Sequence, residues 1–275
     1  MNRDISVLMS VYQNDKSEYI IESIESVINQ TLPPKQLVIV IDGPVGEGIK
    51  STLESLRNKY HVIEVYQLDE NVGLGRALRF GMEKCRYELI ARMDSDDLSM
   101  SDRFMKQVNC FENDASLDVV GSCGLEFITH TNNSMVKSVP KAHEDIVKFM
   151  KSRCPFCHMS VMMKKSAVES AGGYLDYYYA EDWYLWIRMC LNGARFYNIQ
   201  ENLVNIRVDH EFYRRRSGIK LYNSTKNLLK YMREHKMIGF FRYRIEKIKR
   251  FIGYVMTPNW LREKIYRKYM RKTLR

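Results

Sequence analysis

Three aspartates, Asp94, Asp96 and Asp97, lie within a stretch of four residues, directly after an apolar run that is typical of a buried strand. Like charges crowded at a strand end are a poor way to build a core, because each buried carboxylate needs a partner to offset its lost hydration. Side chains two apart on an extended segment point the same way, so Asp94 and Asp96 are expected to face one site. Such hard oxygen ligands suit Mn²⁺ or Mg²⁺, ions that commonly also hold a substrate diphosphate. The alternative is a solvated acidic loop that caps the helix predicted near Asp102.

A second acidic pair, Glu181 and Asp182, follows the aromatic run Tyr174–Tyr179 and precedes Trp183. An acidic pair at a helix start is most often a cap that interacts favourably with the helix dipole. Next to aromatic rings that can stack on a sugar, one carboxylate could instead remove a proton as a general base. From these residues alone the capping role is favoured.

His158 ends the run Cys154–His158, which matches the pattern that attaches haem covalently. Haem attachment of this kind takes place outside the cytoplasm, and the first residues of the chain predict a short strand instead of a secretory signal. We therefore reject haem and expect His158 to line a pocket beside an apolar strand. His210 could be a ligand or a surface histidine, and the surface position is favoured.

The composition indicates a globular chain with room for one substantial domain and an extension, or for two small domains. It has 275 residues, of which 45% are hydrophobic. No apolar run approaches the length needed to span a bilayer, so residence in the cytoplasm is expected. The six cysteines are therefore expected to be reduced thiols.

The net charge of +10 is concentrated at the C-terminal end. Residues 211–275 hold 20 Lys and Arg against 4 Glu, a balance of +16, so residues 1–210 carry a balance of −6. Apolar residues recur at helical spacing in two stripes of this tail: Ile245, Ile248, Ile252 and Val255, then Leu261, Ile265 and Tyr269. Basic amphipathic helices with aromatic anchors, such as Trp260 and Tyr266 here, lie in anionic membrane interfaces. The alternatives are a helical cap packed on the domain and a tail that binds nucleic acid.

The elements that must position these residues alternate between strand-like apolar runs and helical spacing, as a parallel sheet with crossover helices requires. We predict strands over 5–11, 37–41, 62–68 and 89–93, and helices over 20–28, through Leu53 and Leu56, and over 74–85. A mixed region follows, with helices over 102–111, 144–150 and 182–191, strands over 119–128 and 159–163, and a polar loop at 129–134. The tail is predicted as helices broken at Pro258. Ligands gather at the carboxyl ends of parallel strands, where Asp42 and Asp94 both lie.

Taken together, these segments resemble the family 2 glycosyltransferases of the GT-A fold over about residues 4 to 210. The matching motifs are, in chain order, Ser6–Tyr12, Asp42, Asn71–Ala77, the Asp94–Ser95–Asp96 that matches the DxD motif, and the Glu181–Asp182–Trp183 that resembles the ED motif. The resemblance implies an α/β chain with a Rossmann-like, mostly parallel central sheet flanked by helices. We expect a catalytic domain over residues 1–210 and a basic, amphipathic helical extension over residues 211–275.

The same resemblance implies roles for the motif residues. Contacts to the nucleotide-sugar would come from Val11, Tyr12, Asp42, which is similar to the uracil-contacting acid, Asn71, Gly73, Arg76, Asp94 and Ser95. Asp96, with Asp94, would hold Mn²⁺ or Mg²⁺, and His210 lies near the position of a metal-ligating histidine in some relatives. Asp182 would be the catalytic base beside Glu181, and His158 and Trp183 would line the acceptor pocket.

Within the family, the chain resembles bacterial enzymes that build O-antigen, capsule and exopolysaccharide. That implies an inverting transfer of a hexose, with galactose or glucose in β-1,3 linkage favoured, from a UDP-sugar to an N-acetylhexosamine on undecaprenyl diphosphate. The basic tail would hold the enzyme on the inner face of the cytoplasmic membrane, and no nucleic acid is expected as a partner. The alternatives are a glycosyltransferase that modifies proteins and a non-catalytic protein that binds nucleic acid through its tail.

Overall fold

The structure, a computed structural model, describes residues 3–127, 134–208, 217–258, 260–262 and 264–265, and the backbone of residues 272–273. Three residues with predicted roles, His210, Tyr266 and Tyr269, lie outside the described residues.

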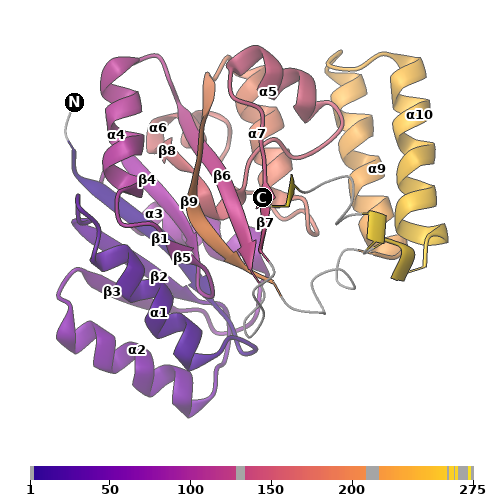
Figure 1. Ribbon diagram of the computed structural model, residues 1–275. Helices are drawn as coiled ribbons and strands as arrows, with labels where there is room; N and C mark the ends of the chain where they lie inside the picture. Colours follow the sequence, from indigo (N-terminus) through magenta and orange to yellow (C-terminus); the bar gives the residue numbers. More distant parts are fainter. Residues whose placement is uncertain are drawn as a thin grey trace.

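Four parallel strands form the first half of the sheet (Figure 1). Their order is β4 (Leu89–Asp94), β1 (Ile5–Val11), β2 (Gln36–Ile41) and β3 (Ile63–Gln67). The side chains of β1, β2 and β4 are almost all buried, as continuous apolar runs in a sheet covered on both faces require. The carboxyl ends of β1, β2 and β4 therefore meet at one edge of the sheet.

The other half of the sheet is mixed. β8 (Met162–Lys164) pairs antiparallel with β4 and with β6 (Val119–Phe127), and β6 pairs antiparallel with β7 (Ser134–Lys137). β9 (Phe196–Arg207) runs parallel to β6 and also pairs with the short β5 (Leu98–Ser99), while β10 (Lys272–Thr273) adds to β7. Because β5 follows the aspartates directly, its pairing with β9 holds the segment that contains them against the sheet.

Helices cover both faces of the sheet, as the alternation along β1 requires. Val7 and Met9 pack in one core cluster and Leu8 packs in the other. The first cluster is covered by α1 (Ser17–Ile28), α2 (Glu47–Lys59) and α4 (Arg103–Asn113). The second is covered by α3 (Leu74–Lys84), α5 (His143–Met150), α6 (Lys165–Ser170) and α7 (Glu181–Leu191).

The tail contributes α9 (Ile219–Glu234), α10 (Phe240–Phe251) and a π-helical turn at Ile252–Met256, and α9 and α10 stand side by side next to α7 (Figure 1). α9 buries Leu228, Leu229 and Met232 in the same core cluster as Trp186 of α7. Within the residues that the structure describes, no helix combines the length and apolar character needed to cross a membrane.

The predicted α/β class with flanking helices is confirmed, and most predicted elements lie within a few residues of the observed ones. The strand predicted over 159–163 is wrong at its start, because His158–Ser160 form a 3₁₀ turn and β8 begins at Met162. Ser134, expected in a polar loop, begins β7.

Candidate active site

The three aspartates of the opening motif lie together at the carboxyl end of β4. One carboxylate oxygen from each of Asp94, Asp96 and Asp97 can be chosen so that all lie within 4.8 Å of one another. Ser23 Oγ of α1 donates to the Asp94 backbone oxygen at 2.8 Å, and the backbone N–H of Arg207 in β9 donates to Asp97 Oδ1 at 2.8 Å. The cluster is therefore fixed by elements on both sides of it.

Electrostatics at this cluster favour a cation. Burial, and then the charges of Asp94 and Asp15, raise the pKa of Asp96 to about 7. Burial and the neighbouring aspartates also raise the pKa of Asp97 well above its usual range, and Asp97 Oδ2 has no hydrogen-bond partner among the described residues. Mutual repulsion between carboxylates and an orphaned buried oxygen are both relieved by a divalent cation, so these residues fit Mn²⁺ or Mg²⁺.

Asp15 is a fourth carboxylate of this region that sequence reasoning missed. Ser95 Oγ donates to Asp15 Oδ2 at 2.8 Å, and the backbone N–H of Tyr12 donates to the same oxygen at 3.0 Å. Burial raises the pKa of Asp15 to about 6. Asp15 thus links the turn after β1 to the aspartate motif. This turn carries Tyr12, which is predicted to contact the nucleotide-sugar. The side chain of Val11 is fully buried and packs in the first core cluster.

Arg92 was also missed, although a lone cation inside a central apolar strand is a sequence signal. Its side chain is 2% exposed and forms an ion pair with Asp94, which lies two residues further on the same face of β4. Neither Nε nor Nη1 of Arg92 has a hydrogen-bond partner within the described part of the chain. A buried guanidinium with unused donors is costly unless something else satisfies it. Arg92 therefore adds a buried cation with unused donors to the aspartate cluster.

Asp42 organises the loop that begins α3. Its Oδ1 accepts a hydrogen bond from the N–H of Val72 at 2.7 Å, and its Oδ2 accepts one from Gly73 at 3.1 Å. Asn71 Nδ2 donates in turn to the Asp42 backbone oxygen at 3.1 Å. A side chain at Gly43 would place its Cβ 2.5 Å from Asn71 N, so the close approach needs glycine. The structure thus brings together Asp42, Asn71 and Gly73, at the N-terminus of a helix.

Arg76, in the first turn of α3, faces the segment that precedes α7. Arg76 Nη2 lies 3.1 Å from Asp176 Oδ2, in an ion pair that is well exposed on both sides. Gly75 lies so close to this segment that a Cβ there would be 2.8 Å from the Leu175 carbonyl oxygen. The start of α3, which carries residues predicted to bind the nucleotide-sugar, is therefore in direct contact with the segment before Asp182.

Asp182 is held by two hydrogen bonds at the N-terminus of α7. Oδ1 accepts one from the N–H of Trp183 at 2.6 Å, and Oδ2 accepts one from the Cys154 thiol at 3.1 Å. Burial, and then the charge of Asp182, raise the pKa of Cys154 well above its usual range, so the thiol keeps the proton that it donates. No sequence pattern predicts this pairing.

Glu181 joins the two acidic clusters electrostatically. Burial raises the pKa of Glu181 to about 7, and Asp182 adds to the shift, while the charge of Arg92 opposes it and that of Asp94 adds to it. The groups that act on Glu181 therefore include residues from the end of β4 as well as its neighbour on α7. The acidic pair of α7 therefore lies within electrostatic range of Arg92 and Asp94.

His158 and Trp183, the two residues predicted to line the acceptor pocket, are both buried and hydrogen-bonded within the protein. His158 Nε2 lies 2.8 Å from the Tyr174 hydroxyl, and burial, followed by the charge of Arg92, lowers the pKa of His158 well below its usual range. His158 is therefore neutral. Trp183 is 5% exposed and its Nε1 donates to the Met150 carbonyl at 2.9 Å. Its indole packs inside the helical layer, and a role for it in a pocket stays a prediction.

Arg207 is a further residue that the predictions did not include. Its Nε donates to the Asp96 carbonyl at 2.9 Å and its Nη2 pairs with Glu22 at 2.6 Å. The guanidinium lies 3.9 Å from the centre of the Tyr19 ring. Arg207 positions the aspartate motif from the end of β9, a strand whose start lies 99 residues after Asp97 in the chain.

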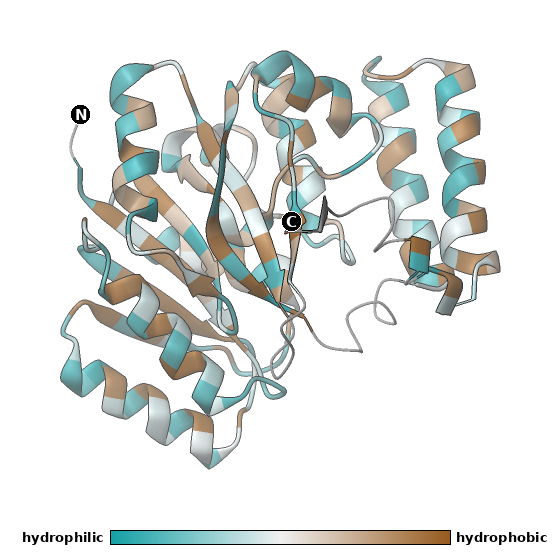
Figure 2. Cartoon of the chain, in the orientation of Figure 1, coloured by the Kyte–Doolittle hydropathy of each residue, from teal (hydrophilic) through white to brown (hydrophobic). Residues whose placement is uncertain are grey.

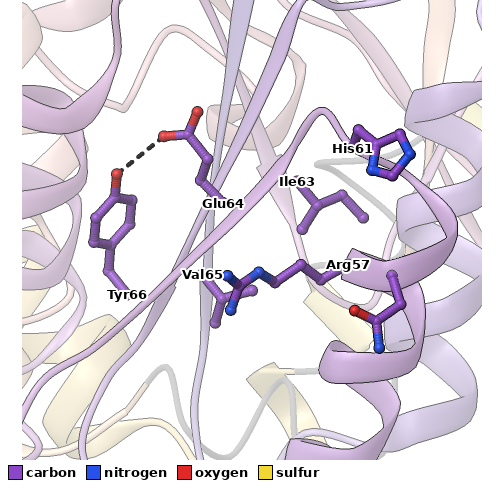
Figure 3. Close-up of a pocket in the computed structure, with 7 residues that line it drawn as sticks. Arg57, His61, Ile63, Glu64, Val65 and Tyr66 are labelled. Atoms are coloured by element: carbon purple, nitrogen blue, oxygen red, sulfur yellow. Dashed lines mark hydrogen bonds between the residues drawn. The ribbon is translucent and has the colours of Figure 1, made fainter.

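A surface hollow of about 560 Å³ lies elsewhere, at the edge strand β3 and the end of α2 (Figure 3). Arg57, His61 and Tyr66 line it, and Glu64 accepts a hydrogen bond from the Tyr66 hydroxyl at 2.9 Å. Glu64 is also paired with Arg86, so its charge is satisfied without a ligand. None of the predicted site residues lines this hollow.

Two curated bacterial proteins resemble most of this chain. "Amylovoran biosynthesis glycosyltransferase AmsE" of Erwinia amylovora is 34% identical over 86% of this chain and 88% of that protein. "UDP-Gal:alpha-D-GlcNAc-diphosphoundecaprenol beta-1,3-galactosyltransferase" of Escherichia coli is 33% identical over 98% of this chain and 97% of that protein.

The fold and the family follow from two further matches. One similar solved structure is the mannosyltransferase PcManGT from Pyrobaculum calidifontis in complex with GDP-Man and Mn²⁺. The match has a TM-score of 0.62 at 16% identity and covers 94% of this chain and 72% of the PcManGT chain. This likeness shows a shared GT-A-like fold. Residues 6–170 match the family described as Glycosyl transferase family 2, over more than half of the chain. The chain belongs to glycosyl transferase family 2.

Proposed function

We propose that this enzyme transfers a hexose, galactose or glucose, from a UDP-sugar to an N-acetylhexosamine on undecaprenyl diphosphate, with inversion and in β-1,3 linkage. The observation that carries the proposal is that the buried Arg92, which is ion-paired with Asp94 of the aspartate motif, also acts electrostatically on Glu181 of the Glu181–Asp182 pair. One acidic cluster suits the diphosphate end of a donor, and the other suits the acceptor hydroxyl.

Asp182 acts as the base in this proposal. Its carboxylate accepts the proton of the acceptor hydroxyl while that oxygen forms a bond to the anomeric carbon from the face opposite UDP. The bond from the anomeric carbon to the diphosphate oxygen breaks, and UDP leaves with the electron pair. Trp183 N–H and the Cys154 thiol hold the carboxylate in position.

Asp96 and Asp94 would hold Mn²⁺ or Mg²⁺. When bound, the ion neutralises charge that develops on the leaving diphosphate. Arg92 keeps Asp94 paired on one side, which leaves the other side of that carboxylate for a ligand. Mn²⁺ is present in the solved PcManGT complex, which has the same fold.

The choice of sugar and acceptor rests on the relatives. The printed name of the Escherichia coli relative gives UDP-Gal as donor and GlcNAc-diphosphoundecaprenol as acceptor, and the Erwinia relative is assigned to amylovoran biosynthesis. Both support a role for this chain in bacterial polysaccharide assembly. A protein acceptor remains the second candidate within the family, and product analysis distinguishes a lipid-linked from a protein-linked sugar.

The test compares wild type with Asp182→Asn, using UDP-sugars and a synthetic lipid-diphosphate N-acetylglucosamine. We expect turnover to fall by at least about 10²-fold, because a general base contributes about that much, while UDP binding in Mn²⁺, read by calorimetry, is nearly unchanged. EDTA is expected to abolish turnover.

Asp145→Asn is the matched control, because Asp145 also lies in the first turn of a helix but is exposed. Wild-type-like turnover of Asp182→Asn would remove Asp182 from the mechanism, and full activity in EDTA would remove the metal. Binding of duplex DNA that falls steeply with salt, without any turnover, would favour the nucleic-acid-binding alternative.

A further inference from the structure

Helix α10 presents an apolar stripe to solvent, whereas two of its charged residues face the protein. Its buried residues are Glu246 and Arg250, each 8% exposed. The apolar residues spaced three or four apart along it and its π-helical turn are exposed: Phe241 80%, Ile245 52%, Ile248 57%, Ile252 49% and Met256 64%. We call these five residues the outer face of α10. This arrangement is the reverse of an ordinary surface helix, whose apolar stripe packs on the core.

The inner side of α10 is attached by polar and aromatic contacts, and Tyr243 packs against the second core cluster. Arg250 Nη2 donates to the Ser152 carbonyl at 2.9 Å, and the guanidinium lies 4.8 Å from the centre of the Trp183 ring. Tyr222 of α9 packs edge-on against Phe251 at 5.3 Å. None of these contacts involves a residue of the outer face.

Exposed apolar side chains are concentrated in this part of the molecule. Of the sixteen large apolar side chains exposed in the described residues, ten lie at or beyond residue 240, including Trp260 at 69%. Figure 2 shows apolar residues recurring along α10 although the helix stands at the outer side of the molecule. A contiguous apolar surface of this kind marks an interaction site.

Basic residues lie on both flanks of the outer face. Arg244 is on one side, Arg242 and Lys249 are on the other, and all three are exposed. An apolar stripe with cations on both flanks is the pattern of a helix that lies in the plane of a bilayer, with its stripe among the acyl chains and its cations at anionic headgroups. A protein partner would not require cations on both sides of the stripe. The charge pattern therefore favours a lipid surface.

We propose that the outer face of α10 docks on a bilayer that contains anionic lipids. The proposal concerns the partner of the chain and does not depend on which sugar is transferred. Because Arg250 contacts Trp183, which follows Asp182 on α7, docking fixes the orientation of the helix that carries the acidic pair relative to the bilayer. An acceptor held by a lipid would then be presented to the site from one side.

The test uses the full chain and large vesicles of phosphatidylglycerol and phosphatidylethanolamine, with phosphatidylcholine vesicles for comparison. Wild type is expected to co-sediment with the anionic vesicles, and binding should weaken in high salt. Phe241→Ser with Ile248→Ser should lower the partition coefficient by about 10-fold or more, because each removes several buried CH₂ groups. Arg242→Gln with Lys249→Gln should reduce the preference for anionic vesicles.

Ile21→Ser is the matched control, because Ile21 is also exposed, at 38%, but lies on α1. It should bind vesicles like wild type. The thermal unfolding temperature of each variant should equal that of wild type, and so should its turnover with a water-soluble acceptor. These two measurements separate a failure of the docking proposal from a failure of the glycosyltransferase proposal. Unchanged vesicle binding in the α10 variants would overturn the proposal. A second outcome would also overturn it: wild type does not bind vesicles but forms a dimer, and the Ser substitutions dissociate that dimer. The outer face would then bind a second copy of the chain.

Discussion

At the scale of single residues, the site depends on donors that hold carboxylates in place. Asp182 accepts hydrogen bonds from a backbone N–H and from a thiol, and Asp15 accepts them from Ser95 and from the N–H of Tyr12. A carboxylate fixed by two donors meets its substrate without first reorganising, which lowers the barrier to reaction. Cys154 is thus a positioning residue, because its thiol holds the Asp182 carboxylate in place.

Replacing Cys154 tests this role. Cys154→Ala removes a hydrogen bond to a charged group, which costs about 1.5–3 kcal/mol, so kcat should fall by roughly 10- to 150-fold while KM for the UDP-sugar stays the same. Cys154→Ser restores an O–H donor and should recover most of the activity. A loss confined to kcat and rescued by Ser is the signature of a positioning role, because a general structural defect would also change KM. Equal kcat values in all three proteins would refute the role.

The sequence predicted the acidic residues of the site but not their partners. Asp94 and Asp96 are predicted as ligands from residue type and spacing, whereas the Glu181–Asp182 pair is predicted as a helix cap from its residues alone and enters the site only through the family resemblance. Cys154 and Asp182 are 28 positions apart, and Asp15 and Ser95 are 80 apart, so their pairing exists only after the chain has folded. A single sequence carries no record of such distances.

At the scale of elements, the close packing of α3 on the sheet positions the donor loop. A Cβ added at Gly81 would lie 2.3 Å from Leu8 Cδ1 and 2.9 Å from Val40 Cγ2. The glycine lets the helix approach β1 and β2, and its N-terminus then presents Gly73 to Asp42.

Gly81→Ala is therefore expected to lower the free energy of unfolding by about 1–3 kcal/mol, the usual cost of overpacking a core. The matched substitution Gly48→Ala, in α2, meets only Ser17 Oγ at 3.7 Å. It should raise stability by about 0.5–1 kcal/mol, because alanine is the better helix former. Urea unfolding of both variants measures the difference, and a Gly81 variant as stable as wild type would contradict this account of the packing.

The elements that were missed share a physical reason. β9 was not predicted, and Gln200, Glu201 and Asn202 interrupt its apolar pattern where the pairing with β6 shifts register. The short strands β5 and β7 are too brief for periodicity to show. The parallel strands were predictable because continuous burial selects continuous apolar runs.

At the scale of the whole molecule, the buried carboxyl groups set the pH dependence of stability. The folded chain keeps the proton of Glu181 up to a pKa of about 7, whereas the unfolded chain loses it near 4.5. Between these pH values the folded state binds more protons, so the free energy of unfolding falls as pH rises. Asp15 and Asp96, with the pKa raised to about 6 and about 7, act in the same direction.

Glu181→Gln should therefore flatten the decline of stability between pH 4.5 and 7 without removing it, since the aspartates remain. The total decline in the free energy of unfolding over this pH range should shrink by about 1.4 kcal/mol for each unit by which the folded and unfolded pKa values of Glu181 differ. Urea unfolding at a series of pH values in metal-free buffer measures it, with Glu144→Gln in the exposed first turn of α5 as the control. A slope identical to that of wild type would show that Glu181 ionises normally.

The central position of β4 limits how the length of this chain can vary. β4 lies between β1 and β8, with Ala91 and Met93 in one core cluster and Arg92 and Asp94 facing the other side. Because faces alternate along a strand, loss or gain of one residue there would turn the Arg92 guanidinium and the Asp94 carboxylate to the opposite face of the sheet, away from Asp96 and Asp97. Insertions and deletions can accumulate in surface turns such as the one around Gly46, but within β4 a single-codon deletion would remove fold and activity together.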